Sequence, residues 1–262
     1  MKGADRLRFL GTVQMERDGE PVVGFRSRKA LAVLGYLAVR DQPLPRQHLA
    51  DLFWADQPEA RGRANLSWVL SRITSLLPGC LQADRQSVQF RCPAELWLDI
   101  VAFAELETRG DAASLAAAAE LVRGEFLEGL YLEGCAEFEL WLVGERERWR
   151  QRVVSVLHAL VAHHSREGQH AEALRSARRL LDLEPWHEET HRQVMLLLAR
   201  SGQRGAALAQ YEACRQVLAG ELGVEPAQET VALHERLRAT ARRQERRRNI
   251  PRPPTPLIAR EA

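Results

Sequence analysis

One segment of the sequence combines a core-packing stripe with a face of side chains that can read bases. In "RGRANLSWVLSRITSLL", residues 61–77, Leu66, Leu70 and Ile73 recur at helical spacing and form the apolar stripe of an amphipathic helix. At about 100° per residue, the opposite face carries the following side chains, with Arg63 nearer the flank: Arg61, Asn65, Trp68, Ser71 and Arg72. Arginine can pair bidentately with guanine, and asparagine with adenine. This face therefore predicts contact with base edges in the major groove of DNA.

Trp68 is an unusual residue for such a face, because an indole offers a single N–H donor. Its large apolar surface suits a thymine methyl group or the edge of a sugar. The alternative is that Trp68 packs against the following hairpin or against a neighbouring subunit. For Arg61 and Arg72 the alternative is an ordinary solvated surface charge.

Further cations lie where phosphates would be bound, at the starts of helices and at a hairpin tip. Arg26, Arg28 and Lys29 begin one expected helix, and Arg46 begins the next. Cations at a helix N-terminus oppose the helix dipole, which favours an external anion there. Arg85 lies at the tip of an expected hairpin, where it would contact phosphate or the minor groove. The alternative for the helix-start cations is an ordinary first turn.

A second pattern, "HEETH" from His187 to His191, formally matches the zinc motif H-E-x-x-H. Pro185 and Trp186 directly precede it, so the segment is expected to start a helix inside a repeat. No convincing third metal ligand follows. No Ser/His/Asp or Cys/His arrangement can be argued from spacing alone. The sequence therefore predicts no enzyme, no metal site and no cofactor.

The elements expected to position the base-reading face follow the order hairpin, three helices, hairpin. They are strands over 7–15 and 21–25 joined by an Asp-Gly turn, helices over 27–39, 45–54 and 59–77, and a hairpin over 80–90. Pro45 is expected as the first helical residue of the second helix. This order is that of a winged helix-turn-helix, in which the third helix enters the major groove.

Charge is distributed unevenly along the chain. Residues 1–95 carry 14 Lys and Arg against 10 Asp and Glu, residues 96–235 carry 14 against 23, and residues 236–262 carry 9 against 2. A basic head can meet phosphates, whereas an acidic middle would be repelled by them. Contact with nucleic acid is therefore expected at the N-terminal part.

The composition indicates a cytoplasmic protein that does not enter a membrane. The longest near-continuous apolar run, residues 31–39, is far short of the roughly 20 residues that cross a bilayer. The N-terminus lacks the layout of a signal peptide. The four cysteines are widely spaced and suit a reducing compartment. Four tryptophans are interpreted as core residues: Trp97, Trp141, Trp149 and Trp186.

After about residue 96 the sequence becomes almost uninterrupted helix and contains an internal repeat. Residues 163–185 align with residues 197–219 at an offset of 34, which places Gly168 on Gly202 and Ala173 on Ala207. A 34-residue period with glycine at the helix turn is typical of tetratricopeptide repeats. Such repeats stack into surfaces that bind other proteins.

Five longer segments carry a family likeness: "FRSRKALAVLGYLA", "LADLFWADQPEARGRANLSWVLSRI", "ELWLDIVAFAEL", "RGEFLEGLYLEGCAEFELWLVGERER" and the stretch from "RRLLDLEPWHEETH" to "GVEPAQET". In these segments and in their order the chain resembles the bacterial transcriptional activators of the antibiotic-regulatory-protein type. The resemblance implies an α+β winged helix-turn-helix domain followed by an all-α tetratricopeptide-like domain, mainly α overall. It implies an OmpR-like DNA-binding domain over 1–95, a bacterial transcriptional activator domain over 96–245 and a Pro-rich linker over 246–262.

Two functions follow from this resemblance. The first is an activator that binds repeats in double-stranded promoter DNA, self-associates as side-by-side protomers there, and recruits RNA polymerase holoenzyme. The alternative is an interaction module of a larger ATP-dependent regulator, because "PPTPLIAREA" is similar to the start of the ATPase domain in larger relatives. No G-x-x-x-x-G-K-[ST] loop occurs in the sequence, so a short form and a fragment both stay open.

Overall fold

The structure is a computed structural model that describes residues 5–22, 27–40 and 42–248, with side chains described as far as residue 240. The chain divides into two compact units, Met1–Ala159 and Leu160–Ala262. The domain boundary predicted at residue 95 was placed from the order of sequence motifs. The two units are divided by compactness instead, so the boundary at residue 95 stays a prediction. None of the described helices is long and apolar enough to span a bilayer.

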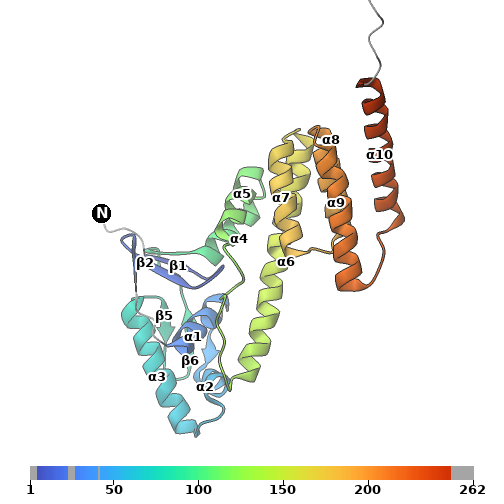
Figure 1. The fold of residues 1–262 in the computed structure, drawn as a ribbon. Helices are drawn as coiled ribbons and strands as arrows, with labels where there is room; N and C mark the ends of the chain where they lie inside the picture. The colour runs from blue at the N-terminus through green and yellow to red at the C-terminus, as the bar shows by residue number, and fades with distance from the viewer. Residues whose placement is uncertain (1–4, 23–26, 41, 249–262) are drawn as a thin grey trace, which may run out of the picture. The chain divides into compact units, whose positions relative to one another are not determined.

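The first unit begins with a sheet of strand order β3-β2-β1-β7 (Figure 1). Its strands are β1 Asp5–Arg8, β2 Gln14–Arg17, β3 Glu20–Pro21 and β7 Leu96–Leu98. The turn between β2 and β3 confirms the expected Asp-Gly turn, and both Asp18 and Gly19 have positive φ, at 52° and 85°. Positive φ at both central residues is the mark of a tight hairpin turn.

The expected strand over 7–15 is wrong, because the chain reverses within it to form the antiparallel pair β1 and β2. Gly11 has a φ of 121°, and its amide donates to the carbonyl oxygens of Phe9 and Glu125 at 3.1 and 2.9 Å. A Cβ at Gly11 would lie 3.1 Å from the Arg123 Cβ. The reversal therefore depends on a close approach between segments far apart in sequence. Of the second expected strand, over 21–25, Pro21 lies in β3, and residues 23–25 lie outside the described residues.

Three helices follow and confirm the expected trio: α1 Arg28–Val39, α2 Arg46–Trp54 and α3 Glu59–Leu76. The side chain of Ser27 caps α1 by accepting from the Ala30 amide. Pro45 is not the first helical residue as expected, because it belongs to β4, Leu44–Pro45, which pairs with β6. The core between the helices contains Leu34, Phe53 and Leu66, all fully buried.

The second expected hairpin is confirmed as β5 Leu81–Ala83 and β6 Ser87–Phe90, which join β4 in a sheet of order β4-β6-β5. We call this hairpin the wing. The chain then returns to the first sheet, where β7 runs parallel to β1. No strand was expected at residues 96–98 from the sequence.

Three helices complete the first unit: α4 Asp99–Arg109, α5 Ala112–Leu121 and the part of α6 Ala136–Arg166 up to Ala159. An aromatic cluster joins α6 to the helical trio, since the Tyr36 ring lies 4.6 Å from the Trp141 ring and the Phe53 ring 5.0 Å from the Phe138 ring. Such contacts between rings add to the burial of their apolar surface.

The second unit is a stack of helices (Figure 1): α7 His170–Leu183, α8 Glu188–Arg200, α9 Arg204–Val217, the π-helical turn η1 Leu218–Leu222, and α10 Gln228–Arg248. Both ends of α9 lie 34 residues after the corresponding ends of α7. Gly168 and Gly202, which precede these two helices, share a positive φ of 71° and 77°. The predicted repeat is thus confirmed, and the predicted fold class with it.

The four tryptophans interpreted as core residues differ in how deeply they are buried. Trp149 is buried as expected, whereas Trp97 and Trp141 are half-buried. The interpretation of Trp186 is wrong, because this residue is 46% exposed at the start of α8. The reason is that a tryptophan just before a helix need not lie on its apolar stripe.

Candidate nucleic-acid interface

The outward face of α3 is built by the helical period. Leu66, Val69 and Ile73 are buried against the rest of the first unit, which turns the opposite side of α3 to solvent. Trp68 on that side is 62% exposed. The other predicted readers Arg61, Arg63, Ser71 and Arg72 are exposed as well. The structure therefore brings the predicted residues together on one accessible face, and their contact with bases stays a prediction.

Asn65 and Arg63, two of the predicted base-reading residues, differ in how firmly their partners within the chain hold them. The Asn65 amide nitrogen donates to Gln57 Oε1 at 2.8 Å, and Asn65 is half-buried. Arg63 forms an ion pair with Glu59 at 3.3 Å, but both side chains are more than half exposed. An exposed pair of this kind contributes little to stability, so Arg63 can exchange its partner for a phosphate more readily than Asn65 can leave Gln57.

Arg46 connects α2, α3 and the wing. Its backbone amide donates to the Gln86 carbonyl at 2.8 Å. Its guanidinium donates to Ser67 Oγ on α3 at 2.9 Å and to the Asp84 carbonyl in the wing turn at 3.4 Å. The predicted phosphate-binding residue therefore also holds the wing beside α3.

The wing turn is shaped by a carboxylate that sequence reasoning did not single out. Asp84 Oδ1 accepts hydrogen bonds from the amides of Gln86 and Ser87, both at 2.7 Å. These bonds hold the pKa of Asp84 below its usual value, because they favour the charged form. Arg85 lies exposed at the tip of this turn. An aspartate that opens a turn is the signal that could have identified Asp84.

The cations predicted to bind phosphate at the start of α1 differ in how accessible they are. Arg28 is exposed, whereas the Lys29 ammonium donates to the Phe53 carbonyl at 2.7 Å and lies 5.3 Å from the centre of the Trp54 ring. To reach a phosphate, Lys29 would have to leave that carbonyl at the end of α2. Arg26 lies outside the described residues.

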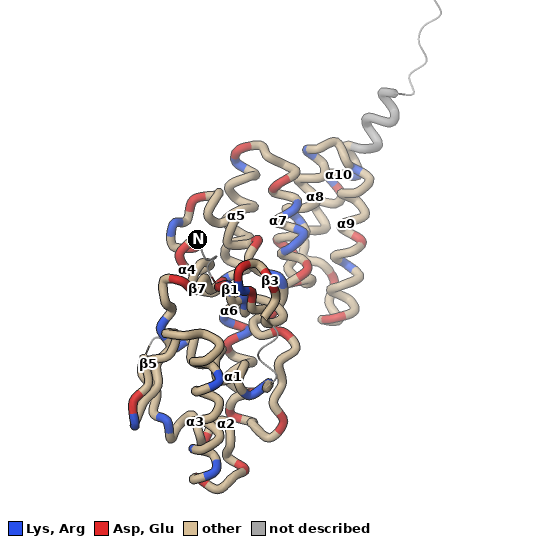
Figure 2. Tube along the Cα trace, turned by 90° about the vertical axis from the view of Figure 1, so that its left-hand side faces the viewer, with Lys and Arg blue, Asp and Glu red and all other residues tan. Residues whose placement is uncertain are grey.

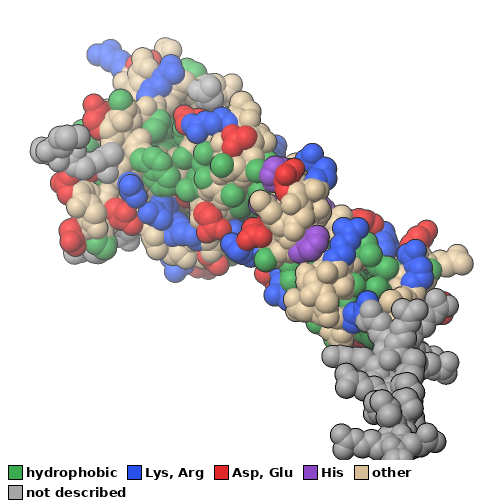
Figure 3. All heavy atoms as spheres, turned by 90° about the horizontal axis from the view of Figure 1, so that it is seen from above, with side chains coloured by type: hydrophobic (Ala, Val, Ile, Leu, Met, Phe, Trp, Pro, Cys, Tyr) green, Lys and Arg blue, Asp and Glu red, His purple; other side chains and the backbone are tan. Residues whose placement is uncertain are grey.

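Charge is distributed differently over the faces of the molecule. Figure 2 shows Lys and Arg at α3 and at the tip of the wing next to β5. On the face drawn in Figure 3, basic and acidic side chains are interspersed around a patch of hydrophobic side chains.

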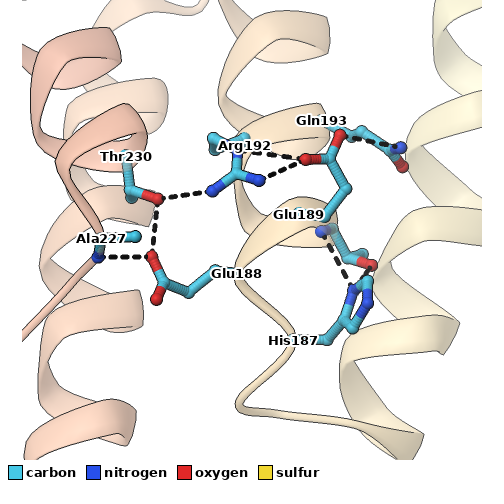
Figure 4. Close-up of polar contacts among 8 residues, drawn as sticks. His187, Glu188, Glu189, Arg192, Gln193, Ala227 and Thr230 are labelled. Atoms are coloured by element: carbon cyan, nitrogen blue, oxygen red, sulfur yellow. Dashed lines mark hydrogen bonds and ion pairs between the residues drawn. The ribbon is translucent and has the colours of Figure 1, made fainter. Parts of the chain in front are cut away.

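The "HEETH" segment has a structural role at the start of α8 (Figure 4). His187 caps the helix, since its Nδ1 lies 3.3 Å from the Thr190 amide. Both ring nitrogens of the buried His191 have partners, the Pro185 carbonyl and the Gln210 amide, each at 2.8 Å. Burial lowers the pKa of His191, because removal from water destabilises the charged form of the imidazole.

The acidic residues of the same segment tie α8 to α10. Glu188 Oε2 accepts from the Ala227 amide at 2.9 Å and from Thr230 Oγ1 at 2.6 Å (Figure 4). Arg192 donates to Thr230 and pairs with Glu189. The side chains that resemble a zinc motif are therefore used to cap and pack helices.

Comparison with known proteins places the second half of the chain in a family. The model of the bacterial transcriptional activator domain matches residues 98–238. The chain is 30% identical over 236 residues to Regulatory protein AfsR of Streptomyces coelicolor, covering 86% of this chain and 23% of AfsR. It is 28% identical over 239 residues to Regulatory protein DnrI of Streptomyces peucetius, covering 84% of this chain and 87% of DnrI.

The fold has a relative among solved structures as well. Mycobacterium tuberculosis EmbR, in a complex with a low-affinity phosphopeptide, matches with a TM-score of 0.67 and 23% identity over 92% of this chain and 66% of that chain. The chain spans about a quarter of the length of AfsR and most of the length of DnrI. The likeness to EmbR concerns the fold.

Proposed function

Because this chain belongs to the family of antibiotic-regulatory-protein type activators, which is marked by the bacterial transcriptional activator domain, we propose that it binds promoter DNA and activates transcription. Its winged helix docks on double-stranded DNA, and its helical repeats bind RNA polymerase holoenzyme. No step of this function requires a cofactor or a catalytic residue.

The observation that carries the proposal is the exposed face of α3 beside the wing. Trp68 and Arg72 face solvent on the third helix of the trio, and Arg46 links this helix to the wing turn that presents Arg85. A helix with an uncovered basic face next to a hairpin is the geometry of a winged-helix reader.

In the proposed complex, α3 enters the major groove. Arg61 and Arg72 read guanine, Asn65 reads adenine if it leaves Gln57, and Trp68 lies against a thymine methyl or a sugar. Phosphate contacts from Arg28 and from the exposed wing residue Arg85 set the register of the protein on DNA.

Activation follows from placing two binding activities in one chain. DNA binding raises the local concentration of the repeat unit beside the promoter, and this unit then stabilises the bound polymerase. Binding to tandem repeats of the operator would place protomers side by side.

Fluorescence anisotropy on the DNA upstream of the protein's own gene tests the DNA interface. Arg61→Ala and Arg72→Ala are each expected to weaken binding by about 1–3 kcal/mol, the worth of a bidentate base contact. Arg200→Ala, which removes an exposed charge in the last turn of α8, is the matched control and should bind like the parent protein. Equal affinity of all three variants would show that α3 is not the recognition helix.

Footprinting with and without polymerase tests activation. Protection of the promoter by polymerase only when this protein is present is the expected result. A footprint that blocks polymerase would instead identify a repressor.

A second candidate is the interaction module of a larger ATP-dependent regulator. The match to only about a quarter of AfsR favours it, whereas the match to most of DnrI favours the first proposal. The open reading frame beyond Ala262 distinguishes them, because a phosphate-binding loop there would assign the chain to the larger type.

A further inference from the structure

An open groove of about 920 Å³ lies in the first unit, away from the outward face of α3. One stripe of α4 contributes Val101, Ala104 and Thr108, at helical spacing. The facing stripe comes from α6, which contributes Trp149 and Arg152. The volume is within the range of sites that hold small molecules.

The third wall of the groove comes from the winged helix. It consists of the end of α1, residues 38–40, and of residues 90–92 at the end of the wing. Phe90 and Ile100 are buried, and Val101 is 38% exposed. The groove therefore has an apolar floor, with Val101 exposed in it.

The rim of the groove is basic. Four arginines line it, Arg40, Arg91, Arg109 and Arg152, against two glutamates, Glu105 and Glu145. Two of these side chains are already in ion pairs, the buried Glu145 with Arg148 at 2.9 Å and Arg152 with Glu107 at 2.6 Å. An anion in the groove would therefore meet a local excess of positive charge, and arginine forks suit carboxylates and phosphates.

A buried donor in the wall of the groove lacks a partner. Among the residues that the structure describes, none accepts a hydrogen bond from Trp149 Nε1, although Trp149 is only 6% exposed. The centre of its ring lies 4.3 Å from the Arg152 guanidinium carbon, and this guanidinium pairs with Glu107. Buried donors in proteins are normally satisfied, which makes this tryptophan an exception beside the groove.

We propose that this groove binds a small amphipathic anion, with an apolar body against Val101 and Phe90 and an anionic head group among the arginines. The groove joins α1 and the wing to α4 and α6. If the proposed DNA-binding function is right, such a ligand would change operator affinity, because it contacts the winged helix and the helices that follow it. Binding of the ligand itself does not depend on that function.

Direct binding of 8-anilinonaphthalene-1-sulfonate to the full chain tests the proposal. The dye has an aromatic body and one sulfonate, and its fluorescence rises in apolar sites. One saturable site is expected, with binding at least about tenfold weaker for two variants. Val101→Glu puts a charge where the aromatic body would lie, and Arg109→Glu places a negative charge beside the sulfonate. The uncharged analogue N-phenyl-1-naphthylamine should bind more weakly than the dye to the parent protein.

Two matched variants serve as controls. Val143→Glu changes an exposed aliphatic residue of α6 outside the groove, and Arg200→Glu changes an exposed arginine in the last turn of a helix, as Arg109 is in α4. Both should bind the dye as the parent does. The proposal would be overturned if the two control variants lost as much dye affinity as Val101→Glu and Arg109→Glu.

Competition and mass measurements complete the test. Displacement of the dye by 1-naphthoate or by 1-naphthyl phosphate identifies the preferred head group, and displacement by neither would contradict the proposal. A fall in the light-scattering mass of Val101→Glu, with no change in dye binding, would show that the groove is covered by a second copy of the chain instead. Circular dichroism verifies that each variant is folded.

Discussion

At the scale of single residues, buried polar groups connect segments that are distant in sequence. Asp99 is 1% exposed, and its carboxylate accepts hydrogen bonds from the amides of Phe9 and Leu10, all at 2.8 Å. It thereby fixes the start of α4 against the end of β1. Burial raises the pKa of Asp99, although these hydrogen bonds oppose the shift.

The raised pKa of Asp99 predicts how stability depends on pH. The folded chain holds the Asp99 proton more tightly than the unfolded chain, so the stability that this residue contributes is full below the unfolded pKa and is lost as pH rises through the folded pKa. The difference in unfolding free energy between the parent and Asp99→Asn should therefore shrink from pH 4 to pH 7. Urea unfolding across this pH range measures it, and a difference that grows with pH would refute the assignment.

The contrast between Arg28 and Lys29 predicts two different phenotypes. Lys29→Ala removes a donor to the Phe53 carbonyl, so it should destabilise the fold by about 1–3 kcal/mol. It should leave the salt dependence of DNA binding unchanged. Arg28→Ala should do the reverse and lower the slope of log affinity against log salt by about 1. The two slopes and the two melting temperatures, measured side by side, decide between these roles.

At the scale of elements, the repeat depends on a left-handed residue before each second helix. Gly202 has a φ of 77° and precedes α9, whereas Gly205 lies within α9 and has open space at its Cβ position. A side chain at position 202 would be strained by the left-handed backbone, whereas an alanine at position 205 would favour the helix.

These two glycines predict opposite effects of the same substitution. Gly202→Ala should lower the unfolding free energy by about 1 kcal/mol or more, and Gly205→Ala should raise it by about 0.4–1 kcal/mol. Thermal or urea unfolding measures both. Effects of the same sign would mean that the turn does not require the left-handed conformation.

At the scale of the whole molecule, the proposed activation depends on mass action. If Arg72→Ala weakens only DNA binding, the variant should activate transcription poorly at low protein concentration and normally once the operator is saturated. Transcription in vitro at increasing protein concentration, with operator occupancy measured in parallel, tests this. A loss of activation that persists at full occupancy would assign Arg72 a contact with polymerase.

The sequence by itself determined the features that depend on local period and on turn chemistry. The apolar stripe of α3, with Leu66 and Ile73 turned inward, sets the exposed face that carries Trp68. The 34-residue offset between Gly168 and Gly202 revealed the repeat. Both follow from the 3.6-residue helical period and from the conformational freedom of glycine.

Only the tertiary structure decided which residues meet across long distances in the chain. It divided the expected strand over 7–15 at Gly11 and paired β7 with β1. It turned Lys29 toward Phe53 and joined Arg46 to the wing. Lys29 and Phe53 are 24 residues apart in the sequence, and the paired residues Leu7 and Leu98 of β1 and β7 are 91 apart. Contacts at such separations leave no periodic pattern in the sequence.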